Sequence, residues 1–572
     1  MLPAQVALGP LGAPPTVLED LGDVVLVGDP ELAGHVGARR LRPLGQVLDD
    51  RERIRGGVGA PVPFLPALCL VGLTGLPPGP GFRRLRQARR RAEQHGKNHK
   101  THCHQGETES ISQYIIRPPA PRPPTRRADF PGAPLNNMPL FARRFGHMGT
   151  ENAFKIGEDM ARARARGVDV IPFTIGEPDF DSAPHINEAG IAAIRAGDTH
   201  YTDPAGIAPL REALAAYVSR TRGIEVAADR IIILPGAKPA IGYTMMAYVD
   251  PGDEVIYPSP GFPIYESWVT YLGGVPKPLV LREERGFSFT PADLDRLLTD
   301  RTKVLMLCSP SNPTGGVLPK SLLEEVAALV KERGRPDIRI YSDEIYEHIT
   351  FDGFEHTSMA SLPGMDRHTI IASGHSKGYA MTGWRLGWCV LPTAEEALRF
   401  KQININTVSC VPPFIQQAAR EALENPKTWE VVGSMVAEFK RRRDYVVPAL
   451  NAIPGISCAN PLGAFYVFPN ITGVCDSLGA TAHYESLPDA LKASTSPATL
   501  ISRFLLYYHG VALVDRRSFG VIGSEGQNFL RLSYAADMDS IREGIRRIAA
   551  GVADHDGFAR FLRDQTALGI AA

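Results

Sequence analysis

Residues 368 to 388 read His-Thr-Ile-Ile-Ala-Ser-Gly-His-Ser-Lys-Gly-Tyr-Ala-Met-Thr-Gly-Trp-Arg-Leu-Gly-Trp. The β-branched run that begins at Thr369 predicts a buried strand, and the Ser/Gly-rich loop after it presents Lys377. Burial or a neighbouring positive charge lowers the pKa of a lysine enough for its amine to attack a carbonyl carbon. Arg385 follows with a planar guanidinium that can bind two phosphate oxygens. The stretch therefore predicts a Schiff-base lysine beside a phosphate anchor.

The run from Ser376 to Gly387 resembles the lysine motif of the fold-type-I, class I/II aminotransferases, which use pyridoxal phosphate (PLP), and most of all their bacterial aspartate aminotransferases. Further motifs of that family occur in order between residues 150 and 550. The resemblance implies an α/β fold with two parts: a large domain whose mostly parallel sheet is flanked by helices, and a smaller α+β domain. It also implies that Lys377 is the catalytic residue, which binds PLP and carries a proton between substrate and cofactor.

Composition excludes several classes of partner. The 572 residues carry zero formal net charge, with 62 residues of each sign, so no global field attracts nucleic acid or an anionic membrane. The seven cysteines are scattered and odd in number, which favours free thiols in a reducing compartment. No apolar run is long enough to cross a bilayer. We expect a soluble, cytoplasmic protein without a nucleic-acid or membrane partner.

The first 137 residues are rich in Pro, Gly and Arg and have no sustained helical or strand period. Such a composition buries too little apolar area to offset chain entropy, so we expect disorder there. The basic cluster at 83–91 is typical of a solvated charge run. The histidine- and cysteine-rich segment at 95–104 lacks a scaffold to bring ligands together, so we expect no metal site. Natural translation could also begin at Met138.

The rest of the chain has the pattern of an enzyme. Good helix formers at 152–165 predict a helix, and the chain after Arg385 is expected to be helical through 414–450. The segments 463–468 and 528–534 are expected to be alternating strands of a smaller domain. We expect three parts, whose boundaries are 138–185 for an N-terminal arm with part of the small domain, 186–430 for the large PLP-binding domain, and 431–572 for the small C-terminal domain.

A phosphate cradle is predicted where the apolar run 231–234 turns into a helix through Gly236, Ala237 and Lys238. Free backbone N–H groups and the positive end of the helix dipole attract a phosphate there. In the family's bacterial branch, a lysine at the place of Lys238 reaches the distal carboxylate of a dicarboxylic substrate; an exposed lysine is the alternative. Some members have a hydroxyl residue where this chain has Gly374, which leaves Ser373 and Ser376 as candidates for the phosphate.

Polar residues that suit PLP chemistry follow two predicted strands. Asp343 can keep the pyridine nitrogen protonated, and Asn312 and Tyr346 can donate to the ring oxygen. Asn312 also belongs to the substrate-binding set. Phe262 occupies the position at which the family places an aromatic ring over the pyridine face, and it is expected to contact cofactor and substrate. Many members have Trp there, whose N–H group Phe lacks.

Two further residues are assigned to the substrate and one to a second subunit. Gly176, in a Gly-Glu-Pro loop, lets a substrate approach the backbone, and in the family it lies against the substrate carboxylate. Arg531, in an alternating strand, matches the family's substrate arginine and can grip the α-carboxylate with two parallel N–H bonds. Tyr201 matches the family's tyrosine that reaches the PLP phosphate of the partner subunit. This resemblance implies a homodimer with shared active sites.

The predicted function is transamination from an L-amino acid, with aspartate or glutamate favoured, to a 2-oxo acid. Transaminases of other specificity, for prephenate or for basic or neutral amino acids, stay open, as does a PLP-dependent C–S lyase. A DNA-binding regulator with an aminotransferase-like domain would need two amphipathic helices near the N-terminus. Residues 1–137 contain no such pair.

Overall fold

The structure is a computed structural model, and it describes residues 140–149, 152–565 and 568. The predicted N-terminal extension, with its basic cluster and its histidine-rich segment, lies outside the described residues. In the part of the chain that is described, no helix combines the length and the apolar character needed to cross a membrane. The predicted helix at 152–165 is confirmed as α3 (Asn152–Ala165).

A seven-stranded sheet forms the centre of the large part, in the order β2-β8-β7-β6-β5-β3-β4. Only β8 runs antiparallel to its neighbours in this sheet, so the sheet is mostly parallel. The helical stretch expected after Arg385 through 414–450 is confirmed as α11 (Pro413–Glu424) and α12 (Lys427–Asn451). Before it, Gly387–Val390 forms strand β8, which was not predicted and which lies between β2 and β7. The other strands are β2 (Ile231–Leu234), β3 (Glu254–Ser259), β4 (Val275–Val280), β5 (Thr302–Cys308), β6 (Arg339–Asp343) and β7 (Thr369–Gly374).

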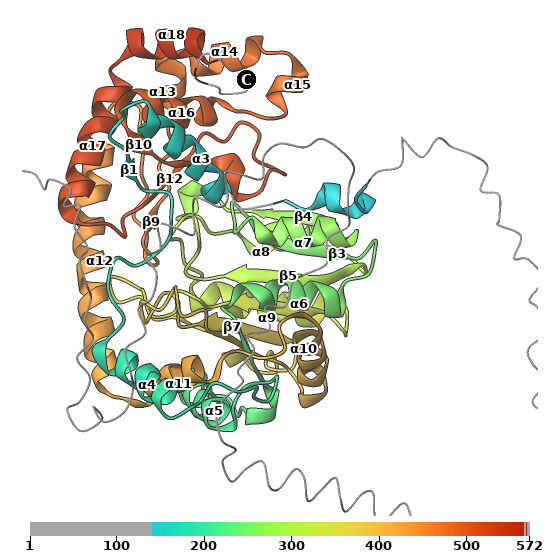
Figure 1. The fold of residues 1–572 in the computed structure, drawn as a ribbon. Helices are drawn as coiled ribbons and strands as arrows, with labels where there is room; N and C mark the ends of the chain where they lie inside the picture. Colours follow the sequence, from blue (N-terminus) through green and yellow to red (C-terminus); the bar gives the residue numbers. More distant parts are fainter. Residues whose placement is uncertain (1–139, 150–151, 566–567, 569–572) are drawn as a thin grey trace, which may run out of the picture. The chain divides into compact units, whose positions relative to one another are not determined.

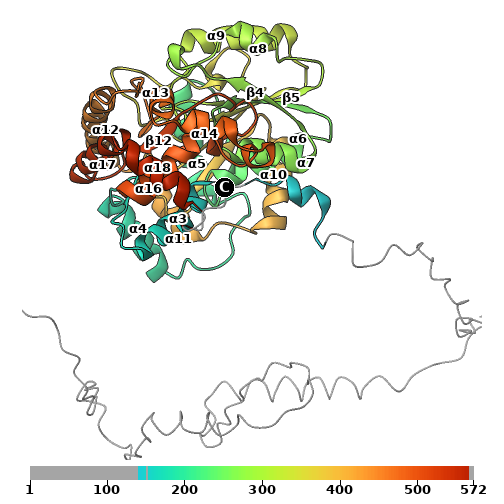
Figure 2. The ribbon, with the colours of Figure 1, turned by 90° about the horizontal axis from the view of Figure 1, so that it is seen from above.

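Helices cover both faces of this sheet (Figures 1 and 2). Successive strand residues point to opposite faces, so Ile231 and Ile233 pack on one side and Ile232 and Leu234 on the other. One face packs against α6 (Lys238–Tyr248), α7 (Ile264–Leu272) and α10 (Ala394–Thr407). The other packs against α4 (Pro184–Arg195), α5 (Ala208–Arg222), α8 (Pro291–Asp295), α9 (Lys320–Arg333) and α11 (Pro413–Glu424).

The smaller part has its own apolar core around short strands. β12 (Leu530–Ser533) pairs antiparallel with β9 (Tyr466–Val467) and with β11 (Val514–Asp515), which confirms the two strands predicted near 463–468 and 528–534. β1 (Ile171–Pro172) pairs with β10 (Val511–Ala512). The helices are α13 (Thr472–Ser477), α14 (Ala480–Ser486), α15 (Asp489–Lys492), α16 (Pro497–His509), α17 (Met538–Val552) and α18 (His555–Asp564).

One long helix, α12 (Lys427–Asn451), links the two parts; in Figure 1 it runs from the level of α4 and α11 to that of α17. Val432, near its start, packs in the core that contains α4 and α11, whereas Phe439 packs in the core of the smaller part. The parallel strands β2, β3, β5, β6 and β7 all end at one edge of the sheet. Side chains that follow these strand ends therefore meet there.

Candidate active site

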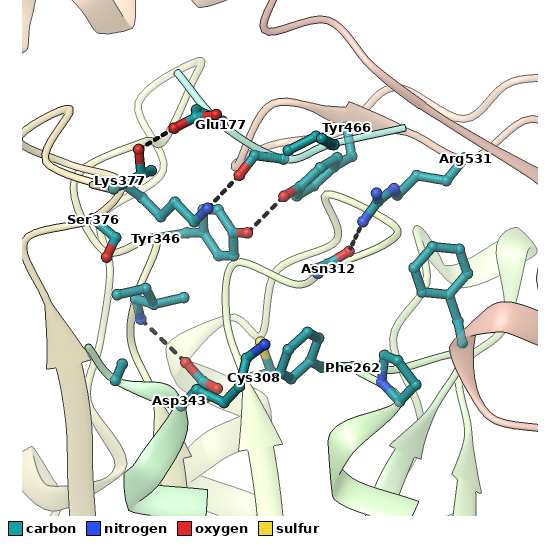
Figure 3. A pocket seen from close by; sticks show the side chains of 18 of the residues that line it. Glu177, Phe262, Cys308, Asn312, Asp343, Tyr346, Ser376, Lys377, Tyr466 and Arg531 are labelled. Carbon is teal, nitrogen blue, oxygen red and sulfur yellow. Dashed lines mark hydrogen bonds between the residues drawn. The ribbon is translucent and has the colours of Figure 1, made fainter. Parts of the chain in front are cut away.

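A cavity of about 540 Å³ lies at this edge of the sheet. Apart from Gly236 and the two candidate serines, it is lined by every predicted site residue except one: Gly176, Ala237, Lys238, Phe262, Asn312, Asp343, Tyr346, Lys377, Arg385 and Arg531. Several of these are shown in Figure 3. The exception is Tyr201, which is 90% exposed and does not line the cavity of its own chain.

Lys377 reaches the cavity from the loop that follows β7 (Figure 3). Its amine donates a hydrogen bond to the backbone carbonyl oxygen of Gly176, and its Nζ lies 5.9 Å from the centroid of the Phe465 ring. Gly176 has a steric role, because a Cβ at that position would lie 1.7 Å from the hydroxyl oxygen of Tyr466. Only glycine lets this loop pass so close to Tyr466 and still present its carbonyl group to the lysine.

Asp343 is the last residue of β6, and its carboxyl group is buried at the floor of the cavity. The Tyr265 hydroxyl donates to one carboxylate oxygen over 2.7 Å, and the Ile345 backbone N–H donates to the other over 3.3 Å. Burial raises the pKa of Asp343 to about 6, although both hydrogen bonds oppose the rise. A buried carboxylate of this kind favours a cationic partner, such as a protonated ring nitrogen.

An anion cradle lies where β2 passes into α6. Helix α6 starts at Lys238, directly after Ala237, so its free N–H groups face the cavity. The Arg385 guanidinium packs over Gly236, where a Cβ would lie 2.2 Å from Nη2, and its Nη1 donates to Thr382 O over 2.7 Å. Fixed N–H groups and a guanidinium together suit a phosphate.

The two candidate serines before Lys377 point in different directions. Ser376 lines the cavity. Ser373 is buried behind it, and its hydroxyl donates to the Glu347 carboxylate over 3.0 Å and to Glu344 O over 3.2 Å. Of these two hydroxyls, only that of Ser376 is placed to reach a phosphate.

Arg531 lies at the opposite end of the cavity from Lys377 and is only 4% exposed (Figure 3). Its Nη1 donates to Asn312 Oδ1 over 2.8 Å, and its Nη2 donates to the Thr174 carbonyl oxygen. The guanidinium carbon lies 4.6 Å from the Tyr466 ring centroid and 4.9 Å from that of Phe519. The aromatic contacts and the hydrogen bonds hold its fork in one orientation, as recognition of a carboxylate requires.

Sequence reasoning missed three aromatic residues of the cavity: Tyr265, Tyr466 and Phe519. The Tyr466 and Tyr346 hydroxyl oxygens are 2.8 Å apart, so Tyr466 links the predicted ring-oxygen donor to Arg531. Tyr466 belongs to the strand pattern noted at 463–468, but alternation indicates only which residues share a face. Glu177 was also missed; it accepts a hydrogen bond from Thr382 across the mouth of the cavity (Figure 3).

The donor set of the cavity fits PLP. The Lys377 amine suits the aldehyde, the buried Asp343 carboxylate suits the ring nitrogen, and the hydroxyl of Tyr346 suits the ring oxygen. The turn at Ala237 and the Arg385 guanidinium suit the phosphate. The cavity thus offers one partner for each polar group of this cofactor.

Known proteins share this sequence and fold. Residues 168–548 match the family "Aminotransferase class I and II". The chain is 38% identical over 408 residues to a probable aspartate/prephenate aminotransferase of Aquifex aeolicus, covering 71% of this chain and 97% of that protein. It is 36% identical to an aspartate aminotransferase of Pyrococcus abyssi, covering 66% of this chain and 91% of that protein.

Solved structures agree with these relatives. The aspartate aminotransferase of Thermus thermophilus with maleate is similar with a TM-score of 0.63 and 34% identity, over 72% of this chain and all of that chain. The aspartate aminotransferase of Rhizobium meliloti gives a TM-score of 0.65 and 33% identity, over 73% and 99% of the two chains. Family, fold and a cavity built for PLP coincide, and this chain therefore belongs to the PLP-dependent class I and II aminotransferases.

Proposed function

We propose that this enzyme transfers the amino group of an acidic L-amino acid, aspartate or glutamate, to a 2-oxo acid. The observation that carries the proposal is a pair of cationic side chains in one cavity. Arg531 lines the cavity and is buried. Lys238 lines it at the start of α6, and its Nζ lies 5.5 Å from the Phe262 ring centroid. Two cations at separate places match the two carboxylates of a dicarboxylic substrate.

The printed names of the relatives support the same substrate class. The Aquifex aeolicus and Pyrococcus abyssi proteins are named for aspartate, and the Thermus thermophilus structure holds maleate, a dicarboxylate. An aromatic-amino-acid aminotransferase of Thermococcus litoralis is 35% identical, so the family tolerates other side chains. Donor preference therefore depends on Lys238 and its surroundings.

In the proposed reaction the side chains divide the work by position. Bound PLP supplies an aldehyde that condenses with amines and a protonated ring that withdraws electrons. Arg531 and Asn312 hold the substrate α-carboxylate, and Asp343 holds the proton on the ring nitrogen. The Lys377 amine takes the proton from the substrate Cα and returns it on the cofactor side, a general acid–base step that typically contributes about 10²- to 10⁴-fold.

Borohydride reduction of the purified holoenzyme, followed by peptide mass mapping, tests the centre of this proposal. The reduced cofactor should be found on Lys377, and Lys377→Ala should lose both the label and transamination. A label on another residue, or an active Ala variant, contradicts the assignment. A panel of amino donors, with the 2-oxo acid products identified, then tests the preference for aspartate and glutamate.

The proposal includes a homodimer with shared active sites. Tyr201 is 90% exposed, and the apolar Leu140 and Phe141 near the start of the described chain are 90% and 67% exposed. Exposed apolar side chains of this size favour burial against a second copy. Mixing a Tyr201→Phe variant with a Lys377→Ala variant tests the shared site, because mixed dimers then differ in activity from either parent. A monomer at assay concentration contradicts the dimer.

We place the enzyme in the cytoplasm. The five cysteines among the described residues, Cys308, Cys389, Cys410, Cys458 and Cys475, form no disulfide, in keeping with a reducing compartment. Fractionation of cells that express the tagged full chain, with a membrane marker and a cytoplasmic marker, tests the location. Recovery with the membrane fraction contradicts it.

A further inference from the structure

Arg516 is a fully buried cation outside the predicted site. It begins the 3-10 turn Arg516–Phe519, which follows β11, and its exposed fraction is 0%. Burial lowers the pKa of Arg516 to about 10, so the side chain stays charged at neutral pH. A buried charge is costly unless hydrogen bonds satisfy it.

All five N–H donors of the Arg516 guanidinium have an acceptor, and all five acceptors are uncharged. Nε donates to Gln527 Oε1 over 2.7 Å, and Nη1 donates to Phe519 O over 3.3 Å and to Gly520 O over 2.8 Å. Nη2 donates to Gly523 O over 3.3 Å and to Ser259 Oγ over 2.8 Å. The side chain thus closes the loop 516–527 on itself and ties it to the end of β3.

The two segments joined in this way both line the active site. Ser259 ends β3, and the backbone N–H of Gly261 donates to Phe519 O over 3.0 Å, one residue before Phe262. Glu266 adds a second tie, because its carboxylate accepts from the backbone N–H groups of Val521 and Ile522 over 3.1 and 3.3 Å. The loop is therefore anchored to the end of β3 at its start and to α7 in its middle.

Phe519 connects the loop to substrate binding, since its ring centroid lies 4.9 Å from the guanidinium carbon of Arg531. We propose that Arg516 is a positioning residue for the substrate: it holds the loop 516–523 against Ser259 so that Phe519 keeps Arg531 oriented toward the substrate carboxylate. This inference rests on the proposed role of Arg531. It adds a residue that acts through the loop and touches neither substrate nor cofactor.

Arg516→Gln tests this link, and the neighbouring Arg517→Gln is the matched control. Arg517 is partly exposed and donates to Ala493 O on the other side of the turn. Glutamine has two N–H donors in place of five, so most of the loop acceptors lose their partner. Binding of maleate, read from the absorbance of the bound cofactor, and the kcat and KM for aspartate should be measured on purified holoenzymes.

We expect Arg516→Gln to raise the maleate Kd and the aspartate KM about 10- to 100-fold. Hydrogen bonds to charged groups are strong, and each tenfold change in Kd corresponds to about 1.4 kcal/mol of binding free energy. The affinity for PLP and the value of kcat should change by less than about threefold, because Arg516 bonds to none of Lys377, Asp343 and Arg385. Arg517→Gln should match the wild type. Equal maleate affinities for Arg516→Gln and Arg517→Gln overturn the inference.

A double-mutant cycle with Phe519→Ala separates positioning from general damage. If Arg516 acts through Phe519, Arg516→Gln adds less than about twofold in a Phe519→Ala background; full additivity overturns the inference. Where Arg516→Gln does not fold, Ser259→Ala replaces it in the same cycle. A wild-type holoenzyme that neither binds maleate nor consumes any amino acid overturns the proposed function itself, which distinguishes the two failures.

Discussion

The Tyr265 hydroxyl donates a hydrogen bond of 2.7 Å to the carboxylate of Asp343. Tyr265 is buried on α7, and its pKa is raised by burial and by the nearby carboxylate, so it stays a donor. The bond favours the ionised carboxylate and thereby opposes the rise that burial imposes on the pKa of Asp343. The ionisation of the carboxyl group that should face the cofactor ring therefore depends on a neighbouring phenol.

Tyr265→Phe should shift the pH dependence of cofactor binding upward. Binding to the cofactor-free protein should strengthen as pH rises through about 6, because Asp343 ionises there. Without the phenol hydroxyl the pKa of Asp343 rises further, so the midpoint should move up by roughly one unit, which corresponds to about 1.4 kcal/mol. Fluorescence titration with PLP between pH 5 and 8 measures it, and an unchanged midpoint contradicts the argument.

Asp343→Asn should stabilise the cofactor-free protein at high pH and abolish activity. The pKa of Asp343 rises from 3.8 in the unfolded chain to about 6 in the folded one, so the folded state holds its proton longer. The free energy of unfolding of the wild type therefore falls as pH rises from about 3.8 to about 6. Above pH 6 the ionised Asp343 carboxylate continues to destabilise the folded state. At pH 8 the variant should gain about 1 to 3 kcal/mol by urea denaturation.

The gain from Asp343→Asn should disappear at about pH 3, below the unfolded pKa of 3.8, where the wild-type carboxyl group is protonated in both states. Asp229→Asn is the control, because Asp229 is an exposed carboxylate that does not line the cavity. The same gain at pH 3 and pH 8 would show that the effect comes from packing and not from charge.

Gly176→Ala should lower kcat/KM by at least about 10-fold through one steric contact. The new methyl group would lie 1.7 Å from the Tyr466 hydroxyl oxygen, so either the loop or the tyrosine must move. Movement of the loop displaces the carbonyl group that accepts from Lys377. Steady-state kinetics with aspartate as donor measures the loss.

Tyr466→Phe should restore only part of the activity of Gly176→Ala. It removes the hydroxyl oxygen but leaves the ring carbon Cζ, which would lie 2.7 Å from the new methyl group. Full recovery in the double variant would mean that the ring itself does not clash, and no recovery would point to a change elsewhere in the loop.

Lys238→Ala should raise the KM for aspartate and glutamate about 10-fold, because one charge-assisted hydrogen bond to the substrate is lost. The KM for alanine or phenylalanine should change by less than about twofold, because these donors have no distal carboxylate. Lys238→Arg keeps the positive charge at the start of α6 and should retain most of the dicarboxylate preference. Equal losses for all donors would remove the argument that two cations select a dicarboxylic substrate.

Arg531→Lys should weaken every amino donor about 10- to 100-fold in kcat/KM, because lysine keeps the charge but cannot bind a carboxylate through two parallel N–H groups. The affinity for PLP should stay within about twofold, since Arg531 lies away from Asp343 and the phosphate cradle. A loss confined to dicarboxylic donors would assign Arg531 to the distal carboxylate.

The order of the elements could be predicted from the sequence because local patterns are enough for them. The apolar runs that became β2, β5, β6 and β7 each end in a short polar motif, and parallel strands bring such motifs to one edge of the sheet. Seven residues chosen from those motifs line a single cavity: Ala237, Lys238, Asn312, Asp343, Tyr346, Lys377 and Arg385. Strand β8 was missed because its four residues follow a motif already assigned to the cofactor, and their pairing depends on β2 and β7.

Which aromatic and charged side chains complete the site was decided only by the tertiary structure. Arg516 and Arg517 are adjacent and chemically identical, yet one is fully buried with five acceptors and the other donates to Ala493 O on the opposite side. Tyr466 meets Tyr346 across 120 residues of chain. Local sequence determines which strand or helix forms, but contacts between distant segments depend on how those elements pack, and no short pattern encodes that packing.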